Sequence, residues 1–232
     1  MINRIFSDQK RFTLLFFVIL FVDIWVKLYC PIFPYRFISK PFVILVLFAF
    51  YYVNKRGKGL KQHLWVFLGL TFFLLGDLLI IKAADIVFLG LSLLLFSLGK
   101  IFFCLKFSHK KDFNVLRLVP FSIIMFSYAV FIISIVLNGL KKFLVPALLS
   151  FFLSLLMVQF AYLRKGVFNK ISYRYVFLGV ITFIISESIM AVKTFRQDLP
   201  FQDFLIMMLY GTAMYFIVLG IVRERRYKIS FS

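Results

Sequence analysis

Eight long apolar segments dominate the sequence, and each is close to the length that an α-helix needs to cross a bilayer. A hydrocarbon layer of about 30 Å requires about 20 residues at a rise of about 1.5 Å per residue. The segments cover residues 12–28, 38–53, 64–81, 86–105, 118–137, 143–163, 175–192 and 204–222. Because lipid offers an exposed backbone no hydrogen-bond partner, each segment is expected to be helical. The sequence therefore predicts an all-α, polytopic bundle of eight transmembrane helices, with residues 1–232 forming a single membrane domain.

The composition agrees with this fold class. Hydrophobic residues make up 63% of the chain and charged residues only 16%, too few to cover the surface of a soluble protein of this size. The net charge of +19 raises the question of nucleic-acid binding. The basic residues, however, lie in short connections between the apolar segments, which is typical of groups that anchor helix ends and contact anionic lipid. Nucleic-acid binding is therefore not expected.

The distribution of lysine and arginine predicts the orientation. The N-terminus, every second connection and the C-terminal tail together carry 19 of the 28 Lys and Arg residues. The other connections carry eight, namely Lys27, Arg36, Lys40, Lys82, Lys141, Lys142, Lys193 and Arg196. By the positive-inside rule both termini face the cytoplasm, which requires an even number of spans. We expect a multi-pass protein of the cell membrane, the inner one if the source is bacterial.

A weak internal similarity in the sequence suggests that the chain consists of two halves of four helices each. Pro41 opens the second predicted span and Pro146 opens the sixth. Asp77 and Glu187 each lie late in the third helix of their half. Two four-helix halves would be same-direction repeats, an arrangement known in some transporters.

Asp77 and Glu187 are the leading candidates for functional residues. A charge in the hydrocarbon costs at least about 2.5–3.5 kcal/mol, so an acid retained there needs a reason. Asp77 lies in LLGDLL and Glu187 in IISESIMA, at a similar depth below the predicted outer ends of their helices. If the third and seventh helices are neighbours, the two carboxyl groups share a polar cavity, where repulsion and desolvation would keep a proton on one of them. The alternative is that each only makes an interhelical hydrogen bond that fixes packing.

Three further charges lie within spans. Lys100 is six residues from Lys106, so its long side chain could extend to the inner headgroups; the alternative is that its ammonium contributes to a site. Asp23 and Lys27 are four residues apart on the first helix and are expected to pair with each other. No histidine lies within a predicted span, and there is no phosphate-cradling glycine loop or cysteine pair. We therefore expect neither a metal ion nor another cofactor.

Several motifs resemble those of the YhhN family of eight-helix membrane proteins, whose characterised members are lysoplasmalogenases. Lys40-Pro41 is similar to the family's Lys-Pro at the second helix, LLGDLL resembles its Gly-Asp motif, and FLGLSLLLFSLGKIFF is similar to the following helix. ISESIMAVKTF resembles its Ser-Asp-Ser segment. DLPFQDFLIMMLYGTAMYFI resembles its Leu-Pro connection and last helix, with Tyr210 at a matching tyrosine. The resemblance extends from about Lys40 to Gly220.

Three positions depart from the family pattern. Lys100 stands where the family usually has His, Glu187 where it usually has Asp, and Met214 where it often has Gln. Replacing Asp by Glu keeps the carboxyl group. Replacing His by Lys removes a side chain that exchanges protons at neutral pH.

The resemblance implies hydrolysis of the vinyl ether bond of a lysoplasmalogen, or of a related lysophospholipid, to a fatty aldehyde and a glycerophospho-headgroup. Asp77 and Glu187 would supply carboxyl general acid and base catalysis. Tyr210 and Ser186 would orient water, and Lys40 and Lys193 would hold the lipid phosphate. The expected substrate-binding or water-orienting residues are thus Lys40, Lys100, Ser186, Lys193 and Tyr210.

Two other functions remain open at this point. The similarity of the two halves and the intramembrane acids would also suit a proton-coupled transporter or lipid flippase. The departures at Lys100 and Met214 would suit a non-catalytic relative that serves as a membrane scaffold.

Overall fold

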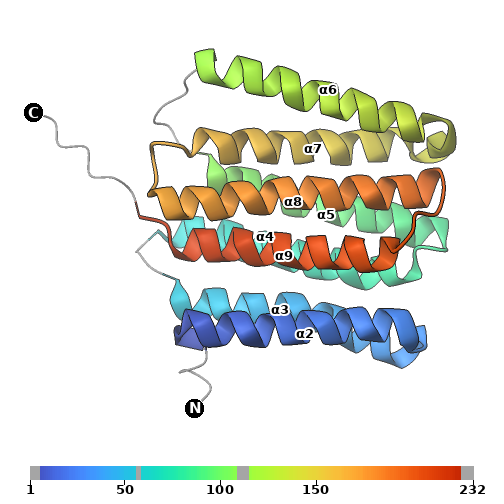
Figure 1. Cartoon of the computed structure of the whole chain (residues 1–232), viewed down its shortest axis with the longest axis horizontal. Helices are drawn as coiled ribbons and strands as arrows, with labels where there is room; N and C mark the ends of the chain where they lie inside the picture. Colours follow the sequence, from blue (N-terminus) through green and yellow to red (C-terminus); the bar gives the residue numbers. More distant parts are fainter. Residues whose placement is uncertain (1–5, 56–58, 109–114, 226–232) are drawn as a thin grey trace, which may run out of the picture.

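The computed structural model describes residues 6–55, 59–108 and 115–225, where the chain is helical without any β-strand (Figure 1). Terminal and loop segments that carry many of the basic residues used to predict the orientation lie outside these ranges. The elements in chain order are α2 (Gln9–Tyr29), η1 (Ile32–Arg36), α3 (Phe37–Asn54), α4 (Leu60–Leu79), η2 (Ile80–Lys82), α5 (Ile86–Phe107), α6 (Val115–Leu140), η3 (Lys141–Phe143), α7 (Leu144–Leu163), α8 (Lys170–Phe195) and α9 (Gln202–Val222).

The prediction of eight spans is confirmed for the described part of the chain, where eight helices are long and apolar enough to cross a membrane. Every predicted segment lies inside helical structure, which extends further at most ends. The seventh span extends furthest beyond its prediction, to Lys170–Phe195, and the second is lengthened by a π-helical turn, Ile32–Arg36, that directly precedes α3. Pro41 accordingly lies within the first turns of α3 rather than at its start.

The helices form a layered bundle with its long axis along the helices (Figure 1). The α2 and α3 helices lie at one edge and α6 lies at the opposite edge, with α4, α5, α7, α8 and α9 between them. Of the eight spans, α9 is the most buried by the rest of the protein and α6 the least. The interior is therefore organised around α9, and α6 forms an outer wall against α7 and α8.

The start of α2 and the end of α9 lie at the same end of the bundle (Figure 1). Hydrogen bonds tie that end together: the Asn54 side chain donates to the Phe6 carbonyl at 2.7 Å, and the Arg225 backbone N–H donates to Asn169 at 3.0 Å. This placement agrees with an even number of spans. The assignment of that end to the cytoplasm, and the internal repeat, remain predictions.

Glycines allow α8 and α9 to pack backbone against backbone. A Cβ atom at Gly179 would lie 2.9 Å from the Ala213 carbonyl oxygen and from the Ile217 nitrogen, and one at Gly220 would lie 2.8 Å from the Val176 nitrogen. Lipid tails are as apolar as the helix surfaces, so the hydrophobic effect does not drive helices together in a membrane. Their association depends on close packing of this kind.

We predict that Gly179→Ala lowers the unfolding free energy by about 1–3 kcal/mol, because the added methyl group meets backbone atoms that cannot move aside. The measurement is reversible unfolding of the purified protein in detergent. Gly90→Ala is the matched control within a span, since its nearest neighbour would be Phe143 Cε1 at 3.7 Å, an ordinary contact. Equal stability of the two variants would contradict the close packing of α8 on α9.

Candidate active site

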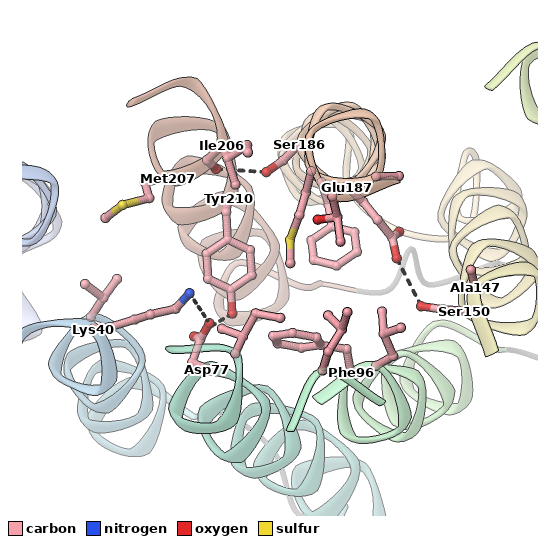
Figure 2. Close-up of a pocket in the computed structure, with 18 of the residues that line it drawn as sticks. Lys40, Asp77, Phe96, Ala147, Ser150, Ser186, Glu187, Ile206, Met207 and Tyr210 are labelled. Carbon is pink, nitrogen blue, oxygen red and sulfur yellow. Dashed lines mark hydrogen bonds and ion pairs between the residues drawn. The ribbon is translucent and has the colours of Figure 1, made fainter. Parts of the chain in front are cut away.

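A cavity of about 120 Å³ lies inside the bundle, in the half away from the start of α2 and the end of α9. Side chains from seven of the eight spans line it, and α6 alone contributes none. One part of the lining is charged and the remainder is mostly apolar (Figure 2). The charged residues in the lining are Asp23, Arg36, Lys40, Asp77 and Glu187.

Asp77 connects three helices at one side of this cavity. It lies two residues before the end of α4, and its side chain is only 2% exposed. Lys40 of α3 places Nζ 3.3 Å from Asp77 Oδ1, and the Tyr210 hydroxyl of α9 donates to Oδ2 at 2.8 Å. A buried carboxylate is tolerated when it is paired and hydrogen-bonded in this way. Asp77 and Tyr210, both predicted site residues, are therefore in direct contact.

Glu187 of α8 occupies the other side, near Ser150 of α7 (Figure 2), and has a different cation, Lys100. Its carboxylate accepts hydrogen bonds from Lys100 of α5, from Ser154 of α7, and from Ser150 of α7 at 3.1 Å. The Glu187 side chain retains 19% exposure, which makes it more accessible than Asp77.

The expectation that Lys100 extends to the inner headgroups is wrong. Lys100 is completely buried, and its ammonium donates to Glu187 and to the Ser150 carbonyl and hydroxyl oxygens at 2.9 and 2.7 Å. A carboxylate and two further acceptors at the same depth satisfy all three N–H groups. Direct pairing in a medium of low dielectric constant is stronger than an interaction with distant headgroups.

The two carboxyl groups line one cavity but do not form a pair. The third and seventh helices meet through side chains, because the rings of Phe73 in α4 and Phe183 in α8 are in edge contact with centroids 5.5 Å apart. Yet Asp77 is neutralised by Lys40 and Glu187 by Lys100. The sequence-based expectation was that repulsion between the two acids would keep one of them protonated. Instead, each carboxylate forms its own ion pair with a lysine.

Asp23 and Lys27 do not pair with each other, contrary to the sequence-based expectation. Arg36 places Nη1 2.5 Å from Asp23 Oδ1 and also donates to the Asp23 carbonyl at 3.1 Å, while the Ser39 hydroxyl donates to Asp23 at 2.7 Å. Lys27, one turn nearer the helix end, instead lies 3.8 Å from Asp203 of α9. One guanidinium nitrogen of Arg36 thus binds both the carboxylate and the backbone carbonyl of Asp23.

Sequence reasoning missed Arg36 as a lining residue and treated it as a loop charge. The spacing between Arg36 and Lys40 could have indicated its place in the lining, because residues four apart lie on one face of a helix. Ser150 and Ser154 were also missed. Serines are common in membrane helices, and only the position of Glu187 distinguishes these two.

The remaining predicted residues lie around the cavity with partners of their own. The Ser186 hydroxyl donates to the Ile206 carbonyl at 2.8 Å and so joins α8 to α9 (Figure 2). Lys193 donates to Asp203 at 2.6 Å and does not line the cavity. Among the residues described, no three His, Cys, Asp or Glu side chains gather closely enough to hold a metal ion.

A second cluster of charges lies at the other end of the bundle. Glu224 lies 3.1 Å from Lys106 and 3.3 Å from Arg164, which connects the ends of α5, α7 and α9. Arg164 is fully buried, with its guanidinium 4.1 Å from the centre of the Phe168 ring. None of these residues lines the cavity, so we assign the cluster to helix packing.

Taken together, eight apolar helices, seven of which line an internal cavity with paired buried charges, define an α-helical, multi-pass membrane protein with an internal site. The sequence model of the YhhN family matches residues 35–221, which is most of the chain, and the protein therefore belongs to the YhhN family. Comparisons with curated proteins and with solved structures gave no significant match.

We predict that Lys100→Met lowers the unfolding free energy by about 3–5 kcal/mol, because it leaves the Glu187 carboxylate without its cation. The double variant Lys100→Met/Glu187→Leu removes both charges and should recover part of that loss. The measurement is again unfolding in detergent. Arg11→Gln is the control, since its ion pair with Asp8 is exposed and should contribute less than about 1 kcal/mol. A single variant as stable as wild type would show that the buried pair does not hold α5 to α8.

Proposed function

We propose that the protein is a hydrolase of the lysoplasmalogenase type, which cleaves the vinyl ether bond of a single-chain glycerophospholipid. One observation carries the proposal: two carboxyl groups, each backed by its own lysine, line one cavity inside a bundle that faces lipid. Membership of the YhhN family supports the same reaction class, since lysoplasmalogenases are known in that family.

The lining of the cavity suits the linkage region of such a lipid. Its charged part, with Asp23, Arg36 and Lys40, would take the polar glycerol end. Its apolar part is formed by α5, α7 and α8 and would take the first carbons of the chain; it includes Leu89, Leu93, Phe96, Phe151, Met190 and Phe195. A substrate whose scissile bond lies just below the headgroup is reached from within the membrane without leaving it.

Glu187 is the proposed proton donor, because it is the more accessible of the two acids. Lys100 donates a hydrogen bond to Glu187, and transfer of the proton along this bond gives a carboxylic acid and a neutral amine. The acid then protonates the outer alkene carbon of the vinyl ether. The resulting oxocarbenium ion lies beside the newly formed carboxylate, which stabilises the positive charge.

Asp77 is the proposed base, and it acts through Tyr210. The Tyr210 hydroxyl already donates to Asp77 and lines the cavity. As water attacks the oxocarbenium carbon, Tyr210 takes a proton from the water and passes its own to Asp77. When the hemiacetal breaks down, that proton returns to the glycerol oxygen and Glu187 takes the hydroxyl proton. One water is consumed, aldehyde and alcohol leave, and both carboxyl groups regain their starting states.

We predict that Glu187→Gln and Asp77→Asn each lower kcat by about 100- to 10,000-fold, the usual range for loss of a general acid or base. The measurement is aldehyde release from an ethanolamine lysoplasmalogen by the purified protein in detergent. Asp85→Asn is the matched control: it is an exposed acid that caps α5, and asparagine preserves the cap.

Folding and chemistry are separated by a conservative variant. Glu187→Asp keeps the carboxyl group and should retain measurable activity where Glu187→Gln has almost none. Wild-type protein that releases no aldehyde, or Asp77→Asn at full rate, would refute the proposed function. Movement of lysolipid across liposome membranes without any product would instead favour the carrier interpretation.

A further inference from the structure

Three charged side chains from three different helices meet just beyond the cavity. Asp203 of α9 accepts a hydrogen bond from Lys193 of α8 at 2.6 Å, and Lys27 of α2 places its ammonium 3.8 Å from the same oxygen. The side chains of Lys27, Lys193 and Asp203 are each about one-third exposed, at 34, 29 and 34%. They are therefore accessible from outside yet partly shielded from it.

This trio forms a rim at one end of the cavity, at the level where Phe195 of α8 still lines it. Lys27 lies one turn beyond Asp23 on α2, Lys193 one turn beyond Met190 on α8, and Asp203 one turn before Met207 on α9. Asp23, Met190 and Met207 all line the cavity. Because residues three or four apart share a helix face, Lys27 and Asp203 lie on the faces of α2 and α9 that line the cavity. Lys193 is held beside them by its hydrogen bond to Asp203.

The rim carries one positive charge more than its acids neutralise. Inside the cavity each described acid has one cation: Asp23 with Arg36, Asp77 with Lys40, and Glu187 with Lys100. At the rim, two lysines share the single carboxylate of Asp203.

Lys27 is the cation least satisfied by this arrangement. At 3.8 Å its contact with Asp203 is an ion pair without a hydrogen bond, and the described part of the chain offers its ammonium no hydrogen bond. Lys193, Arg36 and Lys40 all lie close enough to repel it electrostatically. An anion bound at the rim would supply the missing hydrogen bonds and offset that repulsion.

We propose that Lys27 and Lys193 bind the phosphate of a lysophospholipid whose ether linkage lies in the cavity below. Glu187 is six residues from Lys193 on α8, or about 9 Å along the helix axis, so a glycerol backbone spans the interval from phosphate to reacting bond. This inference rests on the proposed function for the identity of the substrate. It replaces the sequence-based assignment of the phosphate to Lys40, whose ammonium is engaged by Asp77 deeper in the cavity.

The test compares two vinyl ether substrates, a lysoplasmalogen and the 1-alkenylglycerol that lacks the phosphate. We expect the double variant Lys27→Gln/Lys193→Gln to raise KM for the lysoplasmalogen by about 10-fold or more, with little change in kcat. The same variant should leave KM for the alkenylglycerol unchanged. Lys142→Gln removes an exposed lysine from the same end of the bundle and is the matched control; Lys27→Arg/Lys193→Arg should restore the low KM.

Binding measurements keep this inference separate from the proposed chemistry. Lysophosphatidylcholine and a monoacylglycerol have no vinyl ether bond, so their affinities in detergent do not depend on turnover. Loss of affinity for the phospholipid alone in the double variant supports the rim site even if no aldehyde is ever released. Unchanged affinity and KM in that variant would overturn the rim site while leaving the hydrolase proposal intact. Inorganic phosphate that binds as tightly as the lipid would show that the site takes free phosphate instead.

Discussion

The structure depends on neutralising each buried charge with a partner from another helix. In lipid an unpaired carboxylate or ammonium is costly, and within one apolar helix there is rarely a partner at the right depth. Here the pairs join α2 to the turn before α3, α3 to α4, and α5 to α8. The same contacts that make the charges tolerable therefore determine which helices are neighbours, and they converge around the cavity. Packing and the candidate chemistry have a common physical origin.

The two acids contact helices that hold equivalent positions among the first four and the last four spans of the chain. Asp77 in α4 contacts α3 and α9, and Glu187 in α8 contacts α7 and α5. Asp77 lies as many residues after Leu60, the start of α4, as Glu187 lies after Lys170, the start of α8. If the chain consists of two four-helix halves, each acid contacts the second helix of its own half and the fourth helix of the other. The partner side chains differ in chemistry. Asp77 is bound by a lysine and a tyrosine, and Glu187 by a lysine and two serines.

Hydropathy and charge counts were sufficient to predict the eight spans, because lipid imposes helical structure and a narrow range of lengths on any segment that crosses it. The prediction that Asp77 and Glu187 lie inside the bundle, where both line one cavity, could be derived from their places within apolar segments. Their partners could not, because pairing depends on how each helix is rotated about its axis. Lys100 illustrates this limit: along the sequence it is six residues from Lys106, near the helix end, whereas in three dimensions it points at Glu187.

The close contact between α8 and α9 has a consequence for how a lipid enters. Backbone touches backbone at Gly179 and Gly220, and the Ser186 hydroxyl adds a hydrogen bond between the two helices. Glu187 of α8 and Tyr210 of α9 therefore belong to a tightly packed helix pair that we expect to move as one rigid unit. A gap that admits an acyl chain would then arise by displacement of other helices against this pair, so the distance between the proposed proton donor and the proposed water-activating tyrosine is preserved while the lipid enters.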